Sequence, residues 1–134
     1  MSCKSAIFVV NTTTGTALPV NSTYTPNTII RRYGPAIQLA GNGISLTEGG
    51  YYDIAANVTV TAGAAGVVTA KLYRDGTPIP GATSSISAAD GSSVTLPLNA
   101  IVRVTCPCNQ ANITVVMSGV ATTSQNLAIT AEKV

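Results

Sequence analysis

Histidine and tryptophan are absent from the 134-residue sequence, and the acidic residues number only five: Glu48, Asp53, Asp75, Asp90 and Glu132. The absence of histidine excludes Ser-His and Cys-His nucleophile systems, histidine general bases and imidazole zinc sites. Serine and threonine are plentiful, but the sequence offers no evident base to activate them. We therefore predict that the protein is not an enzyme and has no catalytic residue, cofactor or metal ion.

Charged residues of either sign are also scarce, at 9% of the chain with a net charge of +2, whereas an ordinary globular domain has about 25%. Arg31 and Arg32 form the one adjacent basic pair, and no aromatic residues interleave with basic ones around it. Nucleic-acid binding is therefore not expected. The uncharged exterior has two explanations: other subunits cover much of it, or the protein is an extracellular β-domain coated with Thr, Ser and Asn.

The three cysteines, Cys3, Cys106 and Cys108, cannot all pair within one chain. A disulfide between Cys106 and Cys108 would be strained, because the two residues are only two positions apart and a proline separates them. Two thiols alone do not make a metal site. The cysteines are therefore small residues at strand ends, free thiols, or thiols that link one subunit to another.

Long apolar runs are missing. No segment approaches the roughly 18 apolar residues that a membrane helix needs, and the apolar run at residues 6–10 is too short for the core of a signal peptide. We expect no membrane insertion and no export by the general secretory route. Release by host lysis, as with virus particles, fits this pattern.

Period-two alternation of apolar and polar residues recurs along the chain between Gly, Pro, Asn and Asp turns, and helical spacing is absent. The expected strands are 6–11, a segment around Tyr24, 28–33, 36–39, 44–47, 51–62, 67–74, 82–89, 92–98, 101–106, 111–119 and 126–134. We expect eight to ten strands from these twelve segments, and their near-regular spacing predicts an all-β protein, an antiparallel jelly-roll sandwich. Residues 1–134 form a single domain, in which residues 1–12 are an N-terminal arm or a first strand.

The clearest alternation lies in residues 51–62. One face of this strand carries Tyr52, Ile54, Ala56, Val58 and Val60. Its other face is polar, small and nearly uncharged, as in a sheet that packs against a neighbour or is partly wetted. The same reasoning points Val68, Ala70 and Leu72 inward from the next strand, and places Ile113, Val115 and Met117 together on one face of a later one.

The stretch "KLYRDGTPIPGA" combines an Asp75-Gly76 hairpin turn with two prolines directly after it. Pro78 and Pro80 lack the backbone donors that a central strand needs. We therefore expect this segment to end strand pairing at an edge of the sheet and to protect that edge from further strand addition.

Four segments resemble the tumour-necrosis-factor/C1q-like jelly roll: "LTEGGYYDIAANVTVTA", "GVVTAKLYRDGTPIPGA", "SSVTLPLNAIVRV" and "NLAITAEKV". The resemblance covers residues 28–134 and is greatest to the bacterial branch typified by the C-terminal domain of spore-surface collagen-like glycoproteins. "MSCKSA" and "NTIIRRYG" further resemble small proteins encoded in phages and prophages of gut Firmicutes. The chain lacks both a collagen-like stalk and the acidic cluster through which some C1q-like domains bind calcium.

The resemblance implies a homotrimer in which aromatic and apolar strand residues meet around an axis. Candidates for this interface are Tyr51, Tyr52, Tyr73, Arg31 and Arg32. Since Tyr51 and Tyr52 lie on opposite faces of one strand, we expect at least one of them in the monomer core. The two arginines either pair with an acid of an adjacent subunit or lie at a solvated strand end.

The sequence thus favours a non-enzymatic structural protein on the surface of a phage particle, a trimeric capsid decoration or head-fibre protein. Residues 2–10 would contact the capsid lattice or swap between neighbouring subunits. One alternative is a tail receptor-binding or adhesin module that recognises the host surface. Another is a self-assembling spore or cell-surface fibre, whose cysteine cross-links would appear as oligomers on a non-reducing gel.

Overall fold

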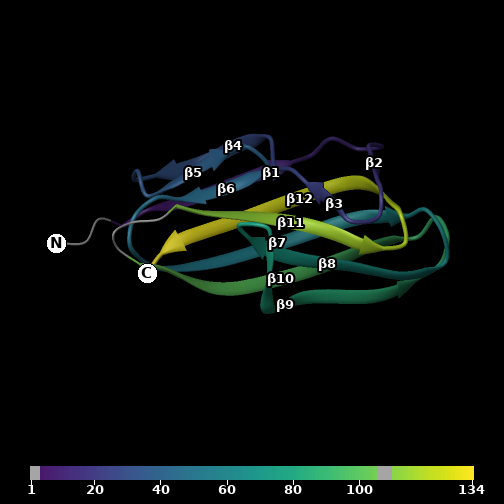
Figure 1. Ribbon diagram of the computed structural model, residues 1–134. Helices are drawn as coiled ribbons and strands as arrows, with labels where there is room; N and C mark the ends of the chain where they lie inside the picture. The colour runs from purple at the N-terminus through teal and green to yellow at the C-terminus, as the bar shows by residue number, and fades with distance from the viewer. Residues whose placement is uncertain (1–3, 106–109) are drawn as a thin grey trace.

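The computed structural model describes residues 4–105 and 110–134, and these ranges contain strands and no helix (Figure 1). The strands are β1 (Ala6–Asn11), β2 (Ala17–Leu18), β3 (Ser22–Tyr24), β4 (Thr28–Tyr33), β5 (Ile37–Ala40), β6 (Gly43–Leu46), β7 (Gly50–Ala62), β8 (Gly66–Arg74), β9 (Thr77–Ala88), β10 (Ser93–Val104), β11 (Ala111–Gly119) and β12 (Thr122–Lys133). No helix of the described chain is long and apolar enough to cross a membrane.

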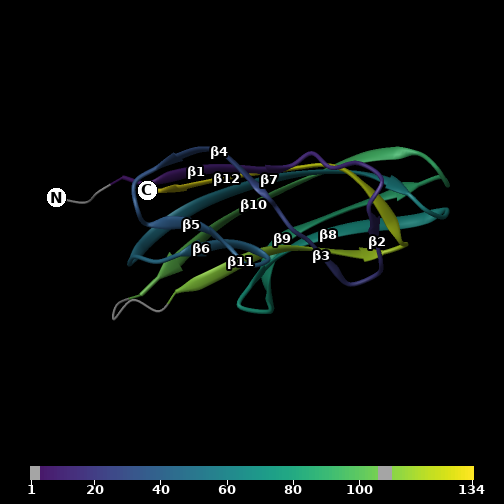
Figure 2. The same cartoon turned by 90° about the horizontal axis from the view of Figure 1, so that it is seen from above.

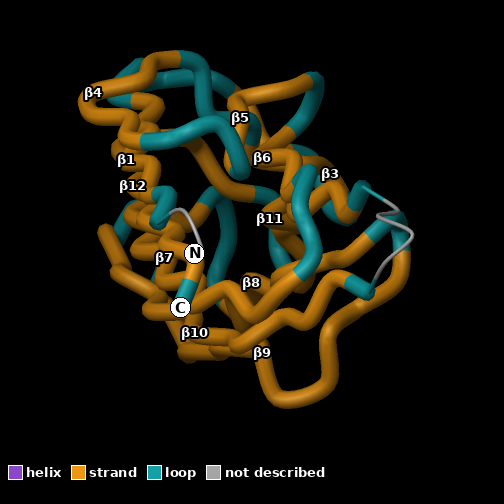
Figure 3. Tube along the Cα trace, turned by 90° about the vertical axis from the view of Figure 1, so that its left-hand side faces the viewer, coloured by secondary structure: helices purple, strands orange, loops and turns teal. Residues whose placement is uncertain are grey.

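The strands form two stacked antiparallel sheets. The first sheet has the order β10-β7-β12-β1-β4, with β2 paired to β12. The second sheet has the order β5-β6-β11-β8-β9, with β3 paired to β11. Figure 2 shows the two layers one above the other, and Figure 3 shows them as opposite walls of the sandwich. The predicted all-β jelly roll is confirmed.

The predicted strands agree with the structure except at edges and short segments. Ten strands have four or more residues, which is the upper end of the predicted range. β2 was not predicted, because two residues are too few to show any periodicity. β10 runs unbroken through Asn99, where the sequence indicated a break. Since β10 is an edge strand, Pro97 needs no donor on the open side.

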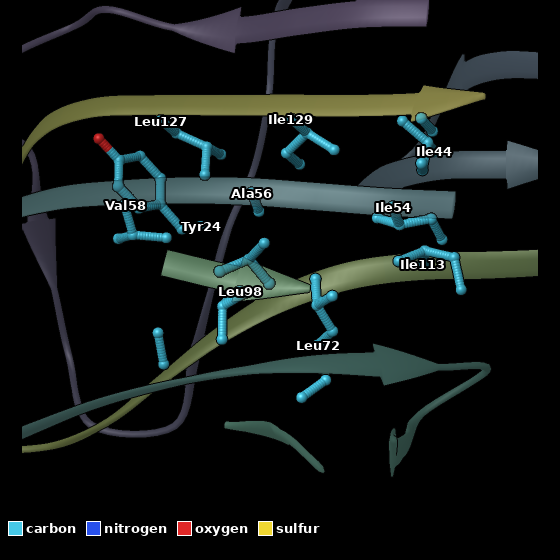
Figure 4. Packing of buried hydrophobic residues seen from close by; sticks show 14 of the residues in the cluster. Tyr24, Ile44, Ile54, Ala56, Val58, Leu72, Leu98, Ile113, Leu127 and Ile129 are labelled. Carbon is cyan, nitrogen blue, oxygen red and sulfur yellow. The ribbon is translucent and has the colours of Figure 1, made fainter. Parts of the chain in front are cut away.

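Alternate side chains of both sheets fill the space between them, as Figure 4 shows. The predicted inward faces of β7, β8 and β11 are all buried. β12 adds Leu127, Ile129 and Ala131 to the same cluster. The core is therefore the product of period-two alternation in every long strand, which turns one face of each sheet inward.

The proline-rich segment lies at the edge of the second sheet, as predicted, in β9. Pro78 pairs with Tyr73, and the next pair joins Thr83 to Lys71, so residues 79–82 bulge out opposite a single residue of β8. The prediction that the prolines end the pairing was wrong, because β9 resumes beyond the bulge. Figure 2 shows the hairpin end bending away from the sandwich.

Two tyrosines are almost fully buried, and their hydroxyls differ in hydrogen bonding. The Tyr52 hydroxyl donates to the Glu48 carbonyl oxygen at 2.6 Å. The Tyr24 hydroxyl lies near the Ser124 side chain but has no hydrogen bond of normal geometry to a described residue. Burial raises the pKa of both tyrosines above the ordinary value.

We expect Tyr52→Phe to lower the free energy of unfolding by about 1 kcal/mol, because a buried hydrogen bond is lost. The matched change Tyr24→Phe should cost a few tenths of a kcal/mol at most, since it removes a hydroxyl without a partner. Urea denaturation of both variants measures the difference. Equal losses would mean that the Tyr24 hydroxyl has a partner after all, either a buried water or the neighbouring Ser124 side chain or Gln125 backbone.

The raised pKa values also predict how stability depends on pH. Because the pKa of both tyrosines is higher in the folded chain than in the unfolded chain, the unfolded side chains lose their protons first, at about pH 10. This ionisation favours the unfolded chain. The free energy of unfolding should therefore fall above that pH. The double variant with phenylalanine at positions 24 and 52 should show a shallower fall in the same titration, and an unchanged slope would contradict this origin.

Candidate functional site

One row of paired residues crosses the outer face of the first sheet from edge to edge. It runs from Tyr33 on β4 through Ala6, Glu132 and Asp53 to Ile101 on β10. Both end residues are largely exposed, at 69% for Tyr33 and 72% for Ile101. At the centre, two carboxylates face each other across neighbouring strands. Like charges in this position repel and destabilise an isolated sheet.

Neither of these carboxylates forms a salt bridge within the described chain, where the one ion pair joins Lys133 Nζ to Glu48 Oε1 at 3.2 Å. Arg103 instead lies over the Tyr51 ring, with its guanidinium carbon 5.7 Å from the ring centre. Asp53 and Glu132 thus form an acidic centre on the outer face, and neither carboxylate has a salt bridge to a described residue.

The edge strand β4 is exposed along its whole length, including the apolar residues Ile29 and Ile30. A hollow of about 320 Å³ lies beside it, lined mainly by Phe8, Arg31 and Tyr33. At the opposite edge, a hollow of about 250 Å³ lies between the β9 bulge and β10. Apolar side chains are thus exposed at both edges of the first sheet.

The structure separates the residues that the sequence placed at one interface. Tyr51 is half exposed on the outer face of the first sheet, and Arg31 lies on the same sheet at its far edge. Tyr52 is completely buried in its own subunit, so its side chain has no surface for a neighbour. Tyr73 lies on the second sheet. Arg32 Nε donates to the Ile37 carbonyl oxygen at 3.2 Å.

Sequence reasoning missed Phe8, Tyr33 and Ile101 on the outer face. Phe8 lies between the buried residues Ile7 and Val9, and Ile101 directly precedes the buried Val102. A large apolar residue at an outward position of an alternating strand was therefore visible in the sequence. The acidic centre was not visible, because Asp53 and Glu132 become neighbours only through the register of β7 and β12.

Two further predictions concern thiols and metals. Cys3, Cys106 and Cys108 lie outside the described residues. Within residues 4–105 and 110–134, no group of three His, Cys, Asp or Glu side chains comes close enough to hold a metal ion.

The outer face of the second sheet carries a different feature, a polar hollow of about 520 Å³. Tyr73 and Thr114 line it from neighbouring strands, Asp75 from the hairpin turn, and Asn42 from the turn between β5 and β6. This hollow lies on the opposite side of the molecule from the acidic centre and the exposed residues of β4.

Neither the models of known protein families nor the curated proteins give a match to this sequence. Solved structures do match over nearly the whole chain. Murine APRIL at pH 5.0 superposes with a TM-score of 0.71 and 14% identity, covering 98% of this chain and 99% of that one. The globular domain of zebrafish complement 1qA gives a TM-score of 0.66 at 10% identity, covering 95% of this chain and 94% of the other.

The PRD1 vertex protein P5 gives a TM-score of 0.65 at 15% identity, covering 100% of this chain and 99% of that chain. The chain has a tumour-necrosis-factor/C1q-like jelly-roll fold. At such low identity the likeness shows the fold alone. The tumour-necrosis-factor/C1q-like fold accommodates a cytokine, a complement domain and a viral vertex protein, so function must be argued from surfaces.

Proposed function

We propose that the protein is a non-enzymatic structural component of a phage particle, where homotrimers decorate the capsid or form head fibres on the virion surface. The fold is shared with a phage vertex protein, and two segments of the sequence resemble small phage-encoded proteins. The capsid protein would be its partner besides its own copies.

The outer face of the first sheet carries this proposal. Its two edges differ: one offers the protruding Tyr33 with Arg31, and the other offers Ile101 beside an apolar hollow. Unlike surfaces that meet between identical subunits make a heterologous contact, which closes into a ring when the rotation allows. Three subunits packed side by side in this way would cover the apolar side chains of both edges.

Charge supports the same arrangement. The acidic centre of Asp53 and Glu132 has no salt bridge to a described residue of its own subunit, whereas the exposed Arg31 lies on the edge that would approach a neighbour. A pair between Arg31 and a neighbour's carboxylate would relieve the repulsion within the acidic centre. Contact between subunits would also explain why only 9% of the residues are charged, because less of the exterior would face water.

A receptor-binding or adhesin role is the second candidate. The polar hollow on the second sheet favours it, because this sheet lies opposite to the face that we propose for trimer formation. The two roles are compatible in one particle, since a decoration protein can also contact the host.

Light scattering should give three times the 13.5 kDa subunit mass. Ile101→Glu should dissociate the trimer, because it puts a charge into an apolar contact, and raise the dissociation constant at least about a hundredfold. Val67→Glu is the matched control, since Val67 is an exposed apolar residue of the second sheet. A monomeric wild type, or equal effects of the two changes, would contradict the proposal.

Charge reversal tests the proposed salt bridge between subunits. Arg31→Glu and Asp53→Arg should each weaken the trimer, and the double variant should recover part of the loss because opposite charges face each other again. Sedimentation equilibrium of the three variants measures the coupling. Purely additive effects would exclude a contact between these two residues.

Immunogold electron microscopy tests the location. Antibodies against the recombinant trimer should label particles from a lysate of the host that carries the gene, on heads rather than tails. Labelling of tails would favour the receptor-binding role, and labelling of uninfected cell surfaces would exclude the phage particle.

A further inference from the structure

We propose that the polar hollow on the outer face of the second sheet is a binding site for a neutral pyranose sugar of a surface glycan. The site stands on its own geometry and does not require the trimer. The sugar site lies on the second sheet, whereas the proposed contacts between subunits lie on the first.

The hollow gathers side chains from segments far apart in the chain. Tyr73 comes from the end of β8, Asp75 from the turn after it, Asn112 from β11, and Asn21 and Asn42 from the turns before β3 and β6. Its volume of about 520 Å³ falls within the range of small-molecule sites, about 300–1,000 Å³. It therefore has room for one sugar ring together with its ordered water.

The acid of the hollow is held in place before any ligand arrives. The Asp75 amide donates to the Asn112 carbonyl oxygen at 2.9 Å, and the Asn112 amide donates to Asp75 Oδ1 at the same distance. Among the described residues these contacts occupy Oδ1 alone, so Oδ2 can accept from a ligand hydroxyl. Such preorganisation lowers the entropy cost of binding.

The backbone at the rim is unusual as well. Within residues 4–105 and 110–134, two non-glycine residues have a positive φ, Asn21 at 64° and Asp75 at 51°. Both line this hollow. Asn and Asp adopt the left-handed conformation more readily than other side chains. Here both residues in that conformation contribute a polar side chain to the lining of the hollow.

The side-chain chemistry matches a sugar. Each asparagine side chain has an NH2 group that donates and a carbonyl oxygen that accepts, and each threonine hydroxyl can both donate and accept. Together they can pair with adjacent sugar hydroxyls. The partly exposed ring of Tyr73 supplies an apolar face for the C–H side of a pyranose. The one charged group that lines the hollow is the Asp75 carboxylate, which disfavours phosphates and acidic sugars.

The direct experiment titrates the intact protein with glucose, galactose, mannose and N-acetylglucosamine, one at a time, and follows backbone amide shifts by NMR. We expect at least one sugar to bind saturably in the millimolar range, with shifts concentrated at Tyr73, Asp75 and Asn112. Tyr73→Ala should weaken binding at least about tenfold, because the stacking face is lost. Val67→Ala, which truncates an exposed apolar residue of the second sheet outside the hollow, should leave it unchanged.

A second pair of variants guards against misfolding. Asp75→Asn keeps the turn, since Asn also tolerates a positive φ, but removes the charged acceptor and should weaken binding several-fold. Asp90→Asn makes the same change in the other Asp-Gly turn and should have no effect. The proposal is overturned if no neutral sugar binds by about 50 mM, or if binding survives both Tyr73→Ala and Asp75→Asn. Light scattering on the same samples reports the trimer separately.

Discussion

β7 pairs with the edge strand β10 on one side and with the central strand β12 on the other, and the surface chemistry of the molecule depends on this pairing. The strict alternation of β7 buries Tyr52, Ile54 and Val58 against the second sheet. The same alternation turns Tyr51 and Asp53 outward. A slip of one residue in either register would exchange the two faces, so the core and the outer face are specified together.

The outer faces of the two sheets can differ in chemistry because their side chains take no part in the packing of the core. On the first sheet, exposed apolar side chains at the two edges flank an acidic centre, a combination that suits contact with another protein surface. On the second sheet, asparagine and threonine side chains surround Tyr73 in a hollow. One sandwich can therefore assemble through one side and present the other to solvent.

The likeness to a cytokine, a complement domain and a phage vertex protein at 10–15% identity has the same physical origin. The inner faces need only apolar side chains of suitable volume in alternation, a condition that many sequences meet. Turns and outer faces are then free to vary. The jelly roll alone consequently does not specify a partner, and the surfaces described above carry the functional argument.

The sequence by itself determined the all-β class, the inward faces of β7, β8 and β11, and the position of Pro78 and Pro80 at a sheet edge, because period-two alternation and missing backbone donors are local properties. Tertiary structure alone decided which outward residues meet. The register of β7 with β12 joins Asp53 to Glu132, and the approach of β11 to the hairpin turn joins Asp75 to Asn112. Tyr51 and Tyr73 are both outward residues of alternating strands, and the sequence does not distinguish them. They lie on opposite sides of the molecule because β7 joins the first sheet and β8 joins the second.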